Sequence, residues 1–229
     1  MTTDRDSILA AIRRSLPAAR LPDARASLPP GAIASTPLEA ATMVELFTRE
    51  LTAVRGRAHG PQTAGQAIET VIELLREAGG DEILAWADEA LPVAGLGEAI
   101  RRAGFKALDA TVPATARADG RRERQTQLAR ASAGVTGAMA GLADTGSIVV
   151  TSSPLRPRLA SLLPPAHIAL LPVDRLYPDL PTFLAHHPDL TQGGSNAVII
   201  TGPSRTADIE LTPVFGVHGP KILHVVLVG

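Results

Sequence analysis

Long apolar runs and polar breaks alternate along the chain, and this pattern predicts its secondary structure. Three continuous apolar runs have the length of strands, at residues 167–173, 196–202 and 222–228. Runs of this kind are typical of strands that are covered on both faces. Shorter runs at 82–87 and 105–110 predict two further strands.

Helical segments separate these strands. The pattern predicts helices over residues 38–55, 63–78, 95–104 and 121–132. Strands that alternate with helices imply parallel pairing with right-handed crossovers. We therefore expect an α/β fold, a mostly parallel sheet flanked by helices.

The N-terminal segment differs from the rest. Residues 4–16 place Ile8, Leu9, Ile12 and Leu16 on one stripe of a predicted helix. A proline-rich connector follows and runs to residue 37. We therefore predict an N-terminal helix and linker over residues 1–37 and one α/β domain over residues 38–229. The first helix is either a separate docking arm or a helix that packs on its own domain.

Composition and charge exclude several classes of function. The net charge of −1 argues against a general role in binding nucleic acid or anionic membranes. The absence of cysteine excludes disulfides, thiolate nucleophiles, iron–sulfur ligation and cysteine zinc sites. No apolar run approaches the ~20 residues of a membrane span, and the first residues are charged where a signal peptide would be apolar. We expect a cytoplasmic protein without a membrane span.

The stretch VIITGPSRTADIE crowds polar groups at the end of an apolar run. Gly202 turns the chain where a predicted strand ends, and ligands of open parallel sheets bind beyond such ends. Ser204 or Thr206 can cap a short helix there, whose free N–H groups would bind phosphate or carboxylate. Arg205 adds a planar set of donors that suits the same anions.

Two carboxylates in this stretch leave its role open. Asp208 and Glu210 would repel an anion unless one of them acts as a base, a nucleophile or a partner for Arg205. If the two share a face, their proximity favours an acid/base pair. The alternative is purely structural, a helix cap with an Arg205–Asp208 ion pair.

Two further turns carry similar groups. Asp144, Thr145 and Gly146 form a predicted turn between apolar stretches, as in a hairpin or a strand entry. His218 lies in a glycine-rich turn before the last strand and is either a proton donor, an anion ligand or a loop-stabilising side chain. His167 stands at the start of a strand, where a structural role is favoured.

We expect these turns to gather around one pocket along one rim of the sheet. The candidate catalytic residues are Glu210, Asp208 and His218. The candidate ligand-binding residues are Asp144, Thr145, Gly146, His167, Gly202, Ser204, Arg205, Thr206 and Gly219. No metal site is predicted.

Four segments, taken in order, resemble a known family. GLADTGSIVV, LPPAHIALLPVDRLYPDL, GPSRTADIE and GVHGPKILHVVLV are similar to segments of the LUD (lactate-utilisation) domain, specifically of the lactate utilisation protein C family. The resemblance covers about residues 40–229. It implies the α/β fold of the sugar-isomerase and CoA-transferase superfamily.

The resemblance also implies a function. Members of the family are encoded with two iron–sulfur partner proteins that together support oxidation of L-lactate to pyruvate. Because this chain has no cysteine, the resemblance implies a subunit without metal clusters or any cofactor of its own. Such a subunit would bind a small anionic ligand, a nucleotide or its partner proteins.

A rival hypothesis is a stand-alone isomerase or acyl/CoA-transferase-like enzyme that acts on an anionic small molecule. Glu210 would then be the nucleophile or base, and Ser204 and Arg205 would hold the anion. A dinucleotide dehydrogenase is not expected, because GLGEAI at Gly95 lacks the third glycine of the phosphate-binding motif. Whether the chain is itself an enzyme stays open at this point.

Overall fold

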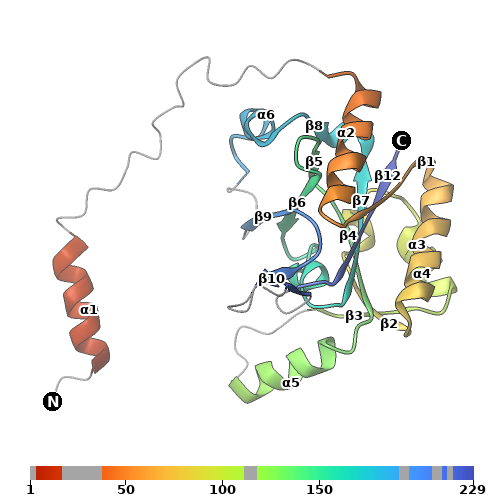
Figure 1. Ribbon diagram of the computed structural model, residues 1–229. Coiled ribbons are helices and arrows are strands. Elements are labelled where there is room, and N and C mark those ends of the chain that lie inside the picture. Colours follow the sequence, from red (N-terminus) through yellow and green to blue (C-terminus); the bar gives the residue numbers. More distant parts are fainter. Residues whose placement is uncertain (1–3, 17–37, 111–117, 191–195, 208–212, 216–218) are drawn as a thin grey trace. The chain divides into compact units, whose positions relative to one another are not determined.

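The computed structural model of the chain describes residues 4–16, 38–110, 118–190, 196–207, 213–215 and 219–229 (Figure 1). The chain divides into two units, Met1–Ala34 and Ser35–Gly229. In the first unit, helix α1 spans Asp4–Ser15, which confirms the predicted N-terminal helix. Its apolar stripe is open to solvent, with Ile8 60% and Ile12 51% exposed.

A six-stranded sheet forms the centre of the second unit. Its strand order is β1-β12-β7-β4-β2-β3, and every neighbouring pair is parallel. The strands are β1 (Arg57–Gln62), β2 (Glu82–Ala85), β3 (Lys106–Leu108), β4 (Ala133–Gly137), β7 (Ala166–Pro172) and β12 (Ile222–Val228). The predicted α/β fold is thereby confirmed. The runs at 167–173 and 222–228 are central strands, as their unbroken apolar character indicated.

Five helices of the described chain belong to this unit: α2 (Ala40–Ala53), α3 (Ala64–Ala78), α4 (Leu96–Arg102), α5 (Ala118–Leu128) and α6 (Leu180–His186). The start of α3 shows how the sequence sets a boundary. The Thr63 side chain accepts from the Gln66 amide while the Gln66 side chain accepts from the Thr63 amide, a reciprocal capping box. At the other end Gly79, with φ of 70°, terminates the helix.

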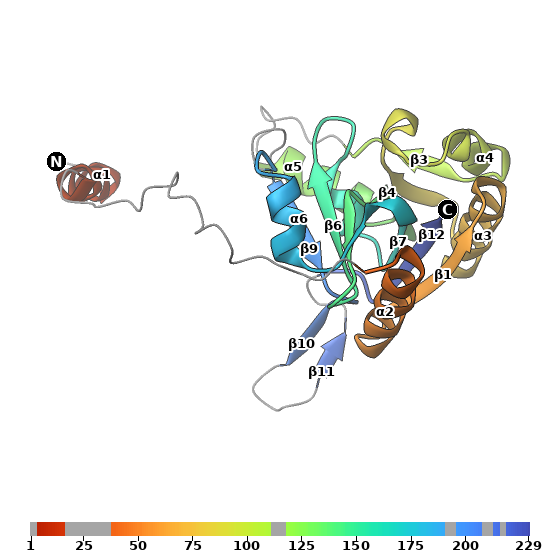
Figure 2. The ribbon, with the colours of Figure 1, turned by 90° about the horizontal axis from the view of Figure 1, so that it is seen from above.

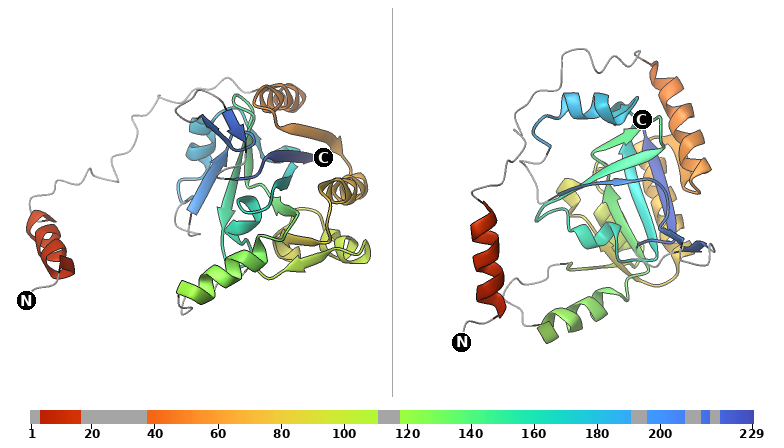
Figure 3. Two further views of the ribbon diagram at one scale, coloured as in Figure 1. Left: turned by 60° about the horizontal axis from the view of Figure 1, so that its bottom comes forward. Right: turned by 60° about the vertical axis from the view of Figure 1, so that its left-hand side comes forward.

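A second sheet lies on the opposite side of the main sheet from α3 and α4, together with α6 (Figures 1, 2 and 3). Its order is β8-β5-β6-β9, with β8 (Leu176–Tyr177), β5 (Ala140–Leu142), β6 (Ser147–Ser152) and β9 (Asn196–Ile200). Ile148 and Val150 of β6 join the main core, while Val149 packs with Phe183 of α6 in a smaller cluster.

The expected place of residues 196–202 was wrong. These residues form β9, which pairs antiparallel with β6 in the second sheet, so they are not a strand of the parallel sheet. One face of β9 is uncovered, and Ile199 is 45% exposed. An apolar run shows that a strand is present, but the sheet it joins depends on long-range pairing.

The predicted helix after Gly202 was also wrong. Residues Arg205–Ala207 form β10, which pairs antiparallel with β11, Pro213–Phe215 (Figure 2). A Ser or Thr that can cap a helix also fits an extended segment. Here the pairing with β11, which comes later in the chain, favours the strand. The predicted helix N-terminus for an anion is therefore absent from residues 204–207.

Candidate functional site

Described parts of the three predicted turns do come together. Asp144, Thr145 and Gly146 form the turn between β5 and β6, as predicted. The hydroxyls of Ser147 and Thr201 lie 2.8 Å apart and link this turn to the end of β9. The Ser147 hydroxyl also donates to Thr145 Oγ1 at 2.9 Å.

The third turn joins the same group. The Ser204 amide donates to the Pro220 carbonyl at 2.9 Å. Gly219 lies so close that a Cβ there would stand 3.3 Å from Ser204 Cβ. Described residues of all three turns therefore form one cluster, which we call the turn cluster (Asp144–Ser147, Thr201–Ser204 and Gly219–Pro220).

The C-terminal end of α2 packs on the turn cluster. A Cβ at Gly146 (φ +61°) would lie 2.1 Å from the Leu51 amide nitrogen, and one at Gly202 (φ +83°) 2.6 Å from the Val54 carbonyl oxygen. Both glycines thus have a packing role, because only glycine permits this approach and this backbone conformation. A helix C-terminus carries partial negative charge, so this contact disfavours an anion beside Gly202.

The candidate catalytic residues fall outside the part of the chain that the structure describes. Asp208, Glu210 and His218 lie outside the described residues. The backbone of Arg205 and Thr206 belongs to β10. Their proposed roles therefore stay predictions.

His167 lies in the core. It is 1% exposed, and its Nε2 is 2.8 Å from Thr136 Oγ1 on the neighbouring strand β4. Its Nδ1 has no hydrogen-bond partner among the described residues. Burial lowers the pKa of His167 to about 4, so the imidazole is neutral at neutral pH.

A second histidine pair occupies neighbouring strands. His59 Nε2 of β1 and His224 Nδ1 of β12 are 2.9 Å apart. Burial, with a smaller contribution from His59, lowers the pKa of His224 to about 4. Burial also lowers the pKa of His59, and the Glu77 carboxylate opposes that shift. His224 is 5% exposed and is therefore part of the core.

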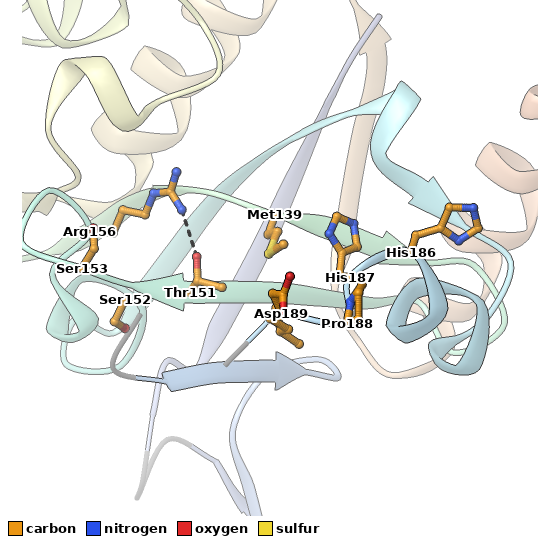
Figure 4. A pocket seen from close by; sticks show the side chains of 10 residues that line it. Met139, Thr151, Ser152, Ser153, Arg156, His186, His187, Pro188 and Asp189 are labelled. Carbon is orange, nitrogen blue, oxygen red and sulfur yellow. Dashed lines mark hydrogen bonds between the residues drawn. The ribbon is translucent and has the colours of Figure 1, made fainter. Parts of the chain in front are cut away.

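A cavity lined by charged and hydroxyl side chains lies at the far end of β6 from the turn cluster. From Ser147 in the turn cluster to Thr151 in the cavity lining, β6 spans four residue steps, roughly 14 Å at about 3.4 Å per residue. The cavity measures about 330 Å³. Its lining comes from Met139 before β5, from the end of β6 and the loop after it, and from the end of α6 and the segment that follows (Figure 4). The residues are Met139, Thr151, Ser152, Ser153, Arg156, His186, His187, Pro188, Asp189 and Leu190.

Arg156 is held in this cavity, here called the arginine cavity, by two contacts. Its Nη1 donates to Thr151 Oγ1 at 3.1 Å (Figure 4). Its guanidinium carbon lies 5.5 Å from the centroid of the Trp86 ring, a cation–π contact. A guanidinium held on a ring face keeps its remaining in-plane N–H donors for a carboxylate or phosphate.

Two histidines stand at the other end of the lining. The His186 Nδ1–H donates to the Thr182 carbonyl at 2.8 Å, which leaves Nε2 available. His187 Nε2 is 3.0 Å from the Tyr177 hydroxyl, and its ring packs on Phe183 with centroids 4.6 Å apart. Both rings are therefore fixed by neighbours while they line the cavity.

Hydroxyl groups complete the lining. Thr151, Ser152 and Ser153 follow one another at the end of β6. When its amide is oriented to satisfy both ends, Asn196 donates to Ser152 Oγ at 2.8 Å and accepts from Arg158 at 3.2 Å. The Arg156 guanidinium and the hydroxyl donors in one cavity suit a small anion, and Asp189 adds a carboxylate.

This cavity was not predicted from the sequence, although the sequence contains a signal for it. Residues 151–158, TSSPLRPR, place hydroxyls and two arginines directly after a buried strand. Residues 202–210 show the same crowding of polar groups after an apolar run. The stack on Trp86 could not have been anticipated, because Arg156 lies 70 positions away from it along the chain.

Among the described residues, no group of three or more His, Asp or Glu side chains is arranged to hold a metal ion. Within the same residues, no helix combines the length and the apolar character needed to cross a bilayer.

Comparison with known proteins identifies relatives over most of the chain. The sequence model of one family, described as LUD domain, matches residues 44–228. The chain is similar to lactate utilization protein C of Shouchella clausii, with 32% identity over 69% of this chain and 66% of that protein. It is also similar to lactate utilization protein C of Anoxybacillus flavithermus, with 31% identity over 69% of each chain.

One further relative matches over a shorter stretch. A protein of Neisseria meningitidis is 41% identical over 40% of either chain. Among solved structures, a DUF162 family protein from Deinococcus radiodurans has a TM-score of 0.55 at 19% identity. That match covers 84% of this chain and 100% of the other, and it supports the fold.

Proposed function

The chain belongs to the LUD domain family, and from this membership we propose that it supports oxidation of L-lactate to pyruvate as a subunit that binds a small anionic ligand in the arginine cavity. Relatives named lactate utilization protein C motivate the metabolic role. The chain covers 40% and 66% of the first two curated relatives it matches, so the role of a whole relative is carried over as a proposal.

The absence of cysteine from the chain motivates the proposal of partner proteins. Lactate oxidation releases two electrons, and iron–sulfur clusters that accept them are held by cysteine thiolates. The chain has no cysteine. We therefore propose that iron–sulfur partner proteins carry the electrons and that this chain contributes a binding site.

The geometry of Arg156 carries the proposal. Thr151 and Trp86 hold the guanidinium in a cavity of about 330 Å³, which is ample for a three-carbon acid. Lactate and pyruvate each carry one carboxylate, and a guanidinium can donate two parallel hydrogen bonds to it. The neighbouring serine hydroxyls can bond the hydroxyl or keto oxygen.

One observation favours a second candidate, a stand-alone isomerase or acyl/CoA-transferase-like enzyme. Asp189 and His187 line the arginine cavity together with Arg156, so a carboxylate and an imidazole share one cavity with an arginine. A carboxylate nucleophile or base beside such groups fits that chemistry. Turnover by the purified chain alone would favour this candidate.

The test is calorimetric titration of the purified chain with L-lactate, pyruvate and inorganic phosphate. At least one anion should bind, and Arg156→Gln should weaken its binding ten-fold or more, because a charge-assisted hydrogen bond contributes about 1.5–3 kcal/mol. Arg49→Gln is the matched control, since Arg49 is an exposed arginine of α2 that pairs with Glu50. The proposal of an anion site fails if no anion binds or if both variants behave alike.

A further inference from the structure

A cavity larger than the arginine cavity is lined by other residues of the loop after β6, the loop that contains Arg156. It measures about 640 Å³. Its lining is Ala85, Trp86, Ala87, Asp88, Ala107, Leu108, Asp109, Ala110, Ser153, Pro154, Leu155, Pro157, Arg158 and Leu159. We call it the tryptophan cavity. None of these lining residues was predicted from the sequence as a site residue.

The position of the tryptophan cavity is that of a ligand site in an α/β fold. Residues 85–88 and 108–110 follow the carboxyl ends of the neighbouring parallel strands β2 and β3. In open parallel sheets, ligands bind in the crevice beyond these ends. The volume also lies within the range of pockets for drug-sized molecules, roughly 300–1,000 Å³.

The two cavities share one wall. Ser153 lines both of them, and the residues that follow it up to Leu159 are divided between them. Arg156 lines the arginine cavity while its guanidinium stacks on Trp86, which lines the tryptophan cavity. A ligand that reached from one cavity into the other would therefore pass this side chain.

The chemistry of the two cavities differs. The tryptophan cavity has a mostly apolar lining of alanine, leucine and proline, with Leu155 52% exposed at its surface. Asp88 and Asp109 add carboxylates to this lining. Asp88 is bonded to Arg101 at 3.0 Å, but a carboxylate has about four acceptor positions and can accept further hydrogen bonds.

We propose that the two cavities hold one ligand, a nucleoside phosphate, with its phosphate at Arg156 and its base and ribose in the tryptophan cavity. This inference rests on the proposed anion site and names the class of its ligand. A three-carbon acid would leave the tryptophan cavity unfilled. A plain acyl chain would offer no donor to the remaining acceptor positions of Asp88, whereas ribose hydroxyls and base amino groups can donate to them.

The experiment compares inorganic phosphate with nucleoside monophosphates that carry each of the four bases. Binding is measured by calorimetry and by the fluorescence of Trp86, the sole tryptophan of the chain. At least one nucleotide should bind ten-fold or more tightly than phosphate, and Arg156→Gln should weaken both. Leu155→Ser should weaken nucleotide binding three-fold or more and leave phosphate binding unchanged.

Leu184→Ser is the matched control, because Leu184 of α6 is 42% exposed and lines neither cavity. Both leucines are solvent-exposed, so both variants should fold, and thermal unfolding verifies this. If lactate, pyruvate or phosphate binds through Arg156 but no nucleotide binds more tightly, this inference is wrong and the proposed anion site stands. A nucleotide that binds equally well to Leu155→Ser also overturns it. If no anion binds at all, both proposals fail together.

Discussion

The Thr136 hydroxyl and His167 Nε2 lie 2.8 Å apart across the parallel strands β4 and β7, inside the core of the main sheet. Both side chains are buried, with exposures of 0% and 1%. This contact satisfies one nitrogen of the imidazole, and the apolar surroundings keep the ring neutral. A buried neutral histidine makes stability depend on pH, since acid must charge it or unfold the chain.

We predict that His167 makes the domain less stable in mild acid. Burial lowers its pKa from 6.5 to about 4 in the folded chain. Protonation therefore favours the unfolded chain, and the stabilisation is complete above about pH 6.5 and is lost as the pH falls toward 4. Between about pH 7 and pH 5, this residue should remove about 2 kcal/mol from the free energy of unfolding.

Urea denaturation at both pH values, with wild type and His167→Gln, measures this effect. The variant should show the smaller loss of stability between the two. NMR titration of the imidazole signal gives an independent measurement in the unchanged protein. A His167 signal that titrates near pH 6.5 would contradict the prediction.

Gly146→Ala should destabilise the protein by about 2 kcal/mol or more. The new Cβ would lie 2.1 Å from the Leu51 amide nitrogen, and the φ of +61° is strained for alanine. Gly65→Ala is the control, because Gly65 lies in α3 with nothing within 4 Å of its Cβ position. That substitution should stabilise by about 0.5–1 kcal/mol. Equal urea midpoints for the two variants would show that α2 does not pack on the turn.

Thr63→Ala should cost about 1 kcal/mol, because it removes the side chain that caps α3. The Thr63 hydroxyl accepts from the Gln66 amide at 3.4 Å, and the reciprocal contact to Gln66 Oε1 is 3.0 Å. Thr52→Ala serves as comparison, since the Thr52 hydroxyl bonds the Thr48 carbonyl inside α2 and caps nothing. Thermal unfolding of both variants should show a lower midpoint for Thr63→Ala alone.

Local pattern was enough to predict much of the fold. The central strands β7 and β12 and the helices α2 and α3 were predicted because their apolar residues repeat at the spacing of the element. Strand β1 was missed because its sequence, RAHGPQ, has no such pattern. Its place at the sheet edge comes from parallel pairing with β12, which lies far away in the sequence.

The site was harder to predict than the fold. The sequence predicted that the turns at 144–146, 202–210 and 216–220 gather around one pocket, but it did not predict the contact of α2 with Gly146 and Gly202. That contact is tertiary and leaves no periodic signal. The arginine cavity depends on distant residues such as Trp86 and Arg156, which the fold alone brings together.

The Trp86–Arg156 contact leads to a final prediction, that Trp86 sets anion affinity without touching the anion. The indole face holds the guanidinium at 5.5 Å, and its Nε1 has no hydrogen-bond partner among the described residues, so Trp86→Phe removes no such bond. Trp86→Leu should weaken phosphate binding three- to ten-fold, since a cation–π contact contributes about 0.5–2 kcal/mol, and Trp86→Phe should weaken it less.

Phe105→Leu is the control, a core aromatic that is 9% exposed and lines neither cavity. It should lower the thermal midpoint and leave the calorimetric affinity unchanged. If Phe105→Leu and Trp86→Leu weakened phosphate binding equally, general loosening of the core would explain both, and Trp86 would not be positioning Arg156.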